Sequence, residues 1–92
     1  MEFEWDNAKA AVNQLNHGVS FDLAQTVFKD PFAIEWLDDR ENYGEDRFLI
    51  IGMAEGHVLL FAAYTERSGR IRIISARRAT KHEQDDYFEQ NV

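Results

Sequence analysis

The residues best suited to chemistry are basic side chains gathered in one short segment, residues 67–81. Six of the ten Lys and Arg residues lie there and no Asp or Glu does, so the segment carries a charge of +6. The remainder, with four basic and seventeen acidic residues, carries −13. A guanidinium stays protonated and offers a planar fork to phosphate oxygens, which is typical of a phosphate-binding site. The six cations are Arg67, Arg70, Arg72, Arg77, Arg78 and Lys81.

This charge pattern has two interpretations. The net charge of −7 argues against a polyanionic ligand, because affinity for nucleic acid depends on cations that displace counterions. A positive segment in an acidic body is instead selective, since the body repels polyanions except where the segment faces them. In the simpler alternative, the arginines pair with nearby carboxylates and form the solvent-exposed surface of a strand. The sequence leaves both open.

A family resemblance carried by two motifs, given below, implies cleavage of RNA, and without a metal this reaction needs three tasks. A base removes the 2′-hydroxyl proton, a cation stabilises charge on the phosphate, and an acid protonates the departing 5′-oxygen. Arginine suits the second task, so we expect Arg72, and after it Arg77, to act in catalysis. The predicted substrate-binding residues are Arg67, Arg70, Arg78, Lys81 and Tyr64.

The proton carrier must come from outside the basic segment, and His17 and Lys9 are the candidates. An imidazole can act as base or acid near neutral pH. The alternative for His17 is a hydrogen bond to a carbonyl at the end of a helix, and for Lys9 a solvated position in a first helical turn. Tyr64 ends an apolar run, so packing in the core with a bonded hydroxyl is the stronger alternative for it.

No metal or cofactor is predicted. The three histidines, His17, His57 and His82, lack the close spacing of a helical metal pair, and the chain has no cysteine. The acidic residues between Asp38 and Asp46 do not follow calcium-loop intervals, so a solvated loop is expected there.

The elements that must position these side chains follow from periodicity. Phe3 and Trp5 alternate with acids, which predicts a short strand. Asp6 is the predicted N-cap of a helix that ends at Gly18. Its apolar positions, Ala8, Ala11, Val12 and Leu15, follow the i, i+3, i+4, i+7 rule.

A second helix is expected from its N-cap Ser20 to Pro31, and four strands follow it. They are predicted at residues 32–37, 48–54, 58–64 and 70–76, with Ile71 and Ile73 facing the core and Arg70 and Arg72 facing outward. The T-x-x-E pattern at Thr80 predicts a capped, peripheral C-terminal helix. The fold class is therefore α+β: a short N-terminal strand and two helices on a mainly antiparallel sheet of about four strands, in one domain spanning 1–92. Without an apolar run of membrane length or an export signal, a cytoplasmic location is expected.

Two separated motifs resemble the BrnT family, toxins of type II toxin–antitoxin systems with a RelE-like ribonuclease fold. The first is FEWDNAKAAVNQLNHGVSFDLAQTVFKDP, and the second combines RFLIIG with YTERSGRIRIISARRATKHE. The resemblance implies an endoribonuclease that cleaves cellular RNA and arrests growth. It also implies neutralisation by a BrnA-type antitoxin, which supplies the DNA-binding part. Membrane association is not expected, and formation of a homo-oligomer stays open.

Two departures from the family pattern keep other functions in view. Asn16 stands where a basic residue is expected, and the C-terminal helix is acidic, with Glu83, Asp85, Asp86 and Glu89. One alternative is a module that binds RNA without cleaving it, with affinity that falls steeply with salt. Another is an interaction protein that only docks its antitoxin partner.

Overall fold

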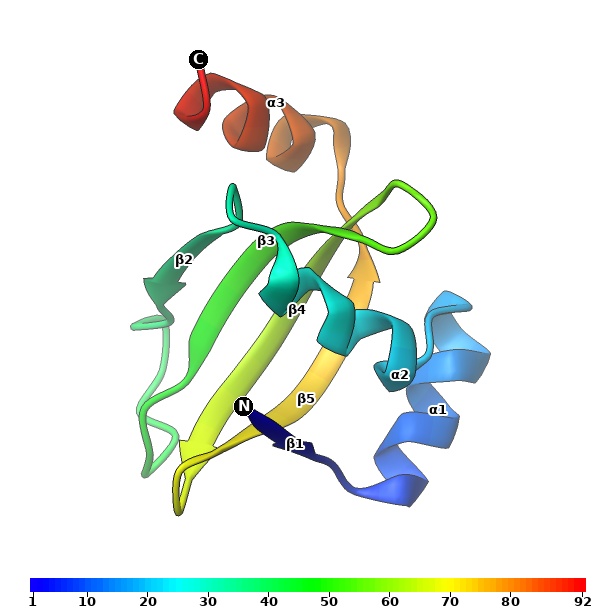
Figure 1. Cartoon of the computed structure of the whole chain (residues 1–92). Coiled ribbons are helices and arrows are strands. Elements are labelled where there is room, and N and C mark those ends of the chain that lie inside the picture. The colour runs from blue at the N-terminus through cyan, green and yellow to red at the C-terminus, as the bar shows by residue number, and fades with distance from the viewer.

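A five-stranded mixed sheet organises the chain, in the spatial order β1-β5-β4-β3-β2 (Figure 1). The computed structural model describes all residues, 1–92. Neighbouring strands are antiparallel except β1, which runs parallel to β5. The predicted α+β fold is confirmed, and the N-terminal strand joins the sheet as its fifth member. The elements are β1 (Glu2–Glu4), α1 (Asn7–His17), α2 (Phe21–Ala24), η1 (Gln25–Lys29), β2 (Ile34–Leu37), β3 (Phe48–Ala54), β4 (Val58–Arg67), β5 (Arg70–Arg78) and α3 (Lys81–Gln90).

The three predicted N-caps and the glycine stop of α1 are confirmed. The Asp6 and Ser20 side chains each accept a hydrogen bond from a backbone N–H of the first turn that follows, at 3.0 Å. Gly18 closes α1 in the left-handed region, with φ of 66°. At Thr80 both hydrogen bonds of a capping box with Glu83 are present.

The core lies on one face of the sheet, beneath α2 and η1, which cross in front of β4 and β5 in Figure 1. The second predicted helix is shorter than expected, because its α-helical part ends at Ala24 and a 3-10 turn completes it before Pro31. The 3-10 turn η1 lies very close to the backbone of β3. A Cβ on Gly52 of β3 would lie 3.0 Å from the Cβ of Val27 in η1, so a side chain there would push the two elements apart.

Helix α1 does not bury its apolar row. Val12 is 55% exposed and Leu15 is 86% exposed, while Asn13 is buried at 7%. Ala10 is the apolar residue through which α1 packs against the core. The apolar row therefore predicts the helix but not the face that it buries, because the helix docks through an amide that completes hydrogen bonds at the edge of β5.

A β-bulge interrupts β5. Ala63 of β4 pairs with Ser75, whereas the next residue, Tyr64, pairs with Ile73, so Ile74 has no partner. An extra residue on one strand shifts the alternation of every side chain beyond it. The bulge thereby decides which side chains of β5 share a face.

Helix α3 is peripheral, as predicted. Tyr87 is its one buried residue, and the Tyr87 hydroxyl donates a 2.7 Å hydrogen bond to Asp30 Oδ2. Figure 1 shows α3 standing apart from the other helices, above the end of the sheet. Across the whole chain, no helix has the length and apolar character that a bilayer crossing needs.

Candidate functional site

Arg72, Ser75 and Arg77 form one row on the face of β5 that points away from the core. They pair with Thr65, Ala63 and Phe61, which alternate along β4 and so share one face of the sheet. Five positions apart on a regular strand, Arg72 and Arg77 would point to opposite faces. The bulge at Ile74 brings both guanidinium groups to the same face.

The arginines of the basic segment are not isolated charges in space. Five of its six cations have a carboxylate within ion-pair distance, and Arg78 is the exception. Arg72 donates to Glu4 at 2.7 Å, although the two residues are 68 positions apart. The segment's charge of +6 is therefore largely neutralised locally, as the simpler interpretation of the sequence proposed. The pairs are Arg67–Glu45, Arg70–Glu2, Arg72–Glu4, Arg77–Glu83 and Lys81–Asp85.

Arg77 is the most firmly held of these cations. Its guanidinium donates to both carboxylate oxygens of Glu83, at 2.7 and 2.9 Å, and lies 4.3 Å from the centre of the Phe61 ring. The hydrogen bonds from Arg77 lower the pKa of Glu83 and raise that of Arg77. Arg77 thus links the first turn of α3 to the outer face of the sheet.

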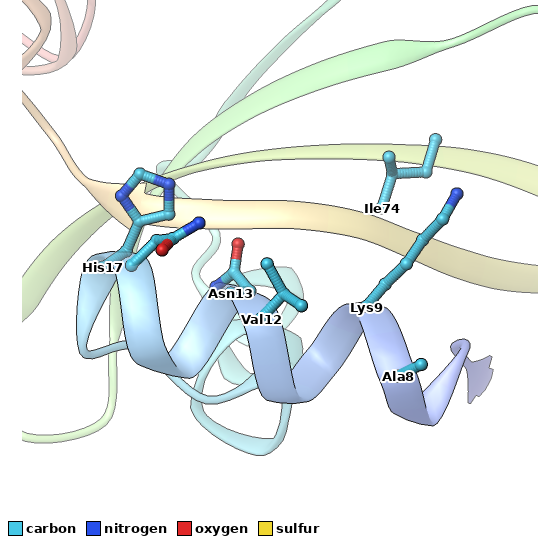
Figure 2. A pocket seen from close by; sticks show the side chains of 7 residues that line it. Ala8, Lys9, Val12, Asn13, His17 and Ile74 are labelled. Carbon is cyan, nitrogen blue, oxygen red and sulfur yellow. The ribbon is translucent and has the colours of Figure 1, made fainter.

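Lys9 and His17 lie together in a groove between α1 and β5. The groove has a volume of about 320 Å³, and Ile74, turned out by the bulge, forms its wall on β5. Figure 2 shows both side chains extending from α1 toward β5. None of the arginines lines this groove. The predicted proton carriers are brought together, but on a different surface from the row of Arg72 and Arg77.

Asp6 connects the two surfaces electrostatically. The N–H of Lys9 donates to the Asp6 carboxylate and lowers its pKa, and the charges of Lys9 and Arg72 contribute to the same shift. Strand β1 meets Arg72 at Glu4 and α1 begins three residues later, whereas Asn13 bonds Ala76, so Lys9 lies at the end of the groove nearer Arg72 and His17 two helical turns further on.

Asn13 is a residue of this region that the sequence analysis missed. Its carboxamide lies in the same groove, between Lys9 and His17, and bonds the backbone of Ala76. No sequence signal marked it, because Asn16 of the same helix is exposed and only the structure shows that Asn13 is buried with bonded partners.

Tyr64 and Arg78 point toward the core side of the sheet. Tyr64 is 6% exposed, stacks on Phe48, and donates a 2.7 Å hydrogen bond to Glu35. Burial and that hydrogen bond raise the pKa of Tyr64. This placement fits the packing alternative, and a substrate-binding role for Tyr64 stays a prediction. Arg78 lines a separate pocket beside α3.

The acidic loop between β2 and β3 is more ordered than expected. Asp38 is only 6% exposed and binds Arg40 through two hydrogen bonds, at 2.7 and 2.8 Å, while the Tyr43 hydroxyl adds a third. The hydrogen bonds from Arg40 hold the pKa of Asp38 far below its usual value. The expectation of a merely solvated loop is wrong for Asp38. No three Asp, Glu or His side chains in the chain cluster in a way that could hold a metal ion.

These features define a small α+β protein that carries a row of arginines on an outer sheet face beside a lysine- and histidine-bearing groove. A family model described as "Ribonuclease toxin, BrnT, of type II toxin-antitoxin system" matches residues 5–83, and the chain belongs to that family. No curated protein matches it. Among solved structures, the chain resembles the crystal structure of the Brucella abortus ribonuclease toxin BrnT. That match has a TM-score of 0.65 and 20% sequence identity, over 88% of this chain and 99% of the other.

Proposed function

We propose that this chain is the toxin of a type II toxin–antitoxin pair, an endoribonuclease that cleaves cellular RNA in the cytoplasm without a metal and arrests growth. The observation that carries the proposal is the shared face of Arg72 and Arg77, which exists only because of the bulge at Ile74. Two guanidinium groups on one outer face can hold the backbone of a single RNA strand. The family to which the chain belongs supplies the reaction class.

Arg72 is the first candidate for stabilising the transition state. Its side chain is 26% exposed and its partner Glu4 is 29% exposed, so the pair lies within reach of solvent. Solvent screens a partly exposed ion pair, so a phosphate with charge-assisted hydrogen bonds can displace Glu4. Arg77 has a stronger competitor in Glu83 and serves chiefly to bind and align the strand.

The reaction consists of attack by the 2′-oxygen on the adjacent phosphorus and departure of the 5′-oxygen. The bond that forms closes a 2′,3′-cyclic phosphate, the P–O5′ bond breaks, and one proton moves from the 2′-hydroxyl to the leaving oxygen. Lys9 is the nearer of the two proton carriers to Arg72, because α1 begins just after Glu4, the strand neighbour of Arg72. His17 is the proposed proton carrier for a phosphate bound further along β5. Each is a proposed base or acid.

The test of catalysis is cleavage of single-stranded RNA by the purified chain in the presence of EDTA. Arg72→Ala should lose cleavage while it unfolds at the same urea concentration as the parent. His17→Gln should lower the rate, and His82→Gln, which alters another exposed imidazole on α3, is its matched control. Undiminished cleavage by Arg72→Ala, or loss of cleavage with EDTA alone, would overturn the proposed site.

A BrnA-type antitoxin is the proposed partner, and the exposed apolar row of α1 is its proposed docking surface. Ala8 and Val12 line the groove, and the row continues outward to Ala11 and Leu15. Exposed apolar side chains in a row are typical of a surface that a partner covers. An antitoxin seated there covers Lys9 and blocks one candidate proton carrier. Co-expression with the cognate antitoxin should relieve growth arrest.

The ion pairs favour one alternative, a chain that docks its antitoxin but does not cleave RNA. If the carboxylates outcompete phosphate at every arginine, no RNA binds the outer face. The same purified chain would then form a stable complex with the antitoxin and leave RNA intact over long incubation. Retention of RNA on a filter at low salt, without cleavage, would indicate the binding module instead.

A further inference from the structure

Arg78 is the one cation of the basic segment that no carboxylate neutralises. It follows Arg77 directly, but the two side chains leave β5 on opposite faces. Arg78 is exposed and lines a pocket of about 330 Å³ between α3 and the β3–β4 hairpin. An arginine without a partner at the mouth of a pocket is available to an anionic ligand.

The walls of this pocket combine polar donors with apolar surface. His57 and Gln84 add side-chain N–H donors, and neither Asp nor Glu is among the lining residues. In a chain with seventeen acidic residues, this pocket shares with the α1 groove a lining that does not repel an anion. The remaining lining residues are Met53, Val58, Leu59, Ala79 and Phe88.

Phe88 gives the pocket a surface for a flat ring. Its side chain is 54% exposed although it is aromatic, and the neighbouring ring of Tyr87 meets it edge to face, with 5.2 Å between centroids. Tyr87 is itself buried and bonded to Asp30, so the Phe88 ring rests on a fixed support. A held and exposed aromatic face suits stacking of a nucleobase.

We propose that this pocket binds one nucleotide of an RNA strand, with its phosphate on Arg78 and His57 and its base against Phe88. The proposal rests on the proposed function for the identity of the strand. The volume is at the lower end of the roughly 300–1,000 Å³ of small-molecule sites, which suits a single nucleotide. An RNA chain that follows Arg72 and Arg77 along the outer face of β5 reaches the pocket by crossing the end of β5 to the other face of the sheet.

Binding of adenosine 5′-monophosphate, followed by amide chemical shifts, tests the pocket apart from catalysis. The largest shifts are expected at Met53, residues 57–59, Ala79 and Phe88. Arg78→Gln should weaken binding about tenfold or more, and Lys29→Gln, which removes an exposed cation outside the pocket, should leave it unchanged. Adenosine, which lacks the phosphate, should bind weakly, and its affinity should be the same for the parent and for Arg78→Gln.

The aromatic contact has its own matched pair. Phe88→Ala should weaken binding of the nucleotide at least about fivefold, as loss of one stacked base does. Phe32→Ala, which truncates a ring that is 57% exposed outside this pocket, should not. Nucleotide shifts that map elsewhere, or an Arg78→Gln variant that binds as the parent does, would overturn the site.

A 2′-O-methyl RNA oligomer, which lacks the attacking hydroxyl, distinguishes an RNA subsite from a site for free nucleotides. Arg78→Gln should lower affinity for this oligomer as well. If only the mononucleotide is affected, the pocket takes free nucleotides and the assignment to RNA is wrong. RNA cleavage without nucleotide binding defeats this inference alone, whereas nucleotide binding without RNA cleavage defeats the proposed function alone.

Discussion

The Asn13 side chain bonds the backbone of Ala76 as a neighbouring strand would. Asn13 Nδ2 donates to the Ala76 carbonyl at 2.8 Å, and the Ala76 N–H donates to Asn13 Oδ1 at 3.1 Å. Strand β1 pairs with β5 only as far as Arg72, so the edge beyond it needs another partner. A third hydrogen bond, 2.9 Å to the Val19 carbonyl, ties the end of α1 to the same point. One amide therefore sets where the groove lies against β5.

Asn13→Ala should destabilise the fold by about 2–4 kcal/mol, because it leaves buried backbone groups without partners, each costing about 1–3 kcal/mol. Urea unfolding followed by tryptophan fluorescence measures this. Asn16→Ala removes the same kind of side chain from an exposed position of α1 and should change stability by less than about 0.5 kcal/mol. Equal effects of the two variants would show that Asn13 does not hold the edge.

Glu4→Gln should increase affinity for RNA by about two- to fivefold, because it frees Arg72 from a pair worth less than about 1 kcal/mol. Fluorescence anisotropy with a 2′-O-methyl RNA oligomer measures the change at low salt. Glu89→Gln alters the net charge equally and removes an exposed carboxylate that forms no ion pair. If Glu89→Gln gains as much, overall charge and not the release of Arg72 is responsible.

Attachment of α3 should depend on acidic pH through Asp30. Burial acts to raise the pKa of Asp30, but hydrogen bonds from the Met53 N–H, the Tyr87 hydroxyl and the Phe32 N–H outweigh it and lower that pKa. A lowered pKa stabilises the folded state above the usual value near 3.8, and that stabilisation is lost as the pH falls through the folded value. Amide exchange in α3 should therefore accelerate, relative to β4, below about pH 4.

Asp30→Asn serves as the comparison for that experiment. A neutral amide weakens the bond to Tyr87 at every pH, so exchange in α3 should be faster at pH 7 and should lose most of its acid dependence. Burial, together with this hydrogen bond to Asp30, raises the pKa of Tyr87 to about 12. An unchanged pH profile in Asp30→Asn would assign the acid sensitivity to another carboxylate, with Glu83 the next to examine.

Val12→Asp and Leu15→Asp should each abolish the complex with the antitoxin while the isolated chain stays folded. Both residues are exposed, at 55% and 86%, so a carboxylate there changes the stability of the isolated chain little. It destabilises an apolar interface, because the charge would be buried in the complex. Gln14→Asp places the same charge on an exposed polar position of α1 and is the control. Co-purification after co-expression gives the result, and a complex that survives all three substitutions places the antitoxin elsewhere.

Local features of the fold followed from the sequence alone. The caps at Asp6, Ser20 and Thr80 depend on hydrogen bonds within one turn, and the β3–β4 hairpin depends on two apolar runs around a glycine turn. Short-range interactions of this kind are determined by residues that are neighbours in the sequence. The two family motifs likewise identified the BrnT family from residue order, and the segment from Arg67 to Lys81 was recognised as the place where the basic residues gather.

Only the tertiary structure decided what those basic residues face. Arg72 meets Glu4 from the other end of the chain, and such a pair depends on strand neighbours rather than on sequence distance. The bulge at Ile74, which no local pattern announces, turns Arg77 to the face of Arg72 and Arg78 away from it. The apolar period of α1 predicted a helix correctly, but packing chose the face of Asn13 because the open edge of β5 needed hydrogen-bond partners. Charge cancellation, strand register and edge pairing are properties of three-dimensional proximity, and the site depends on all three.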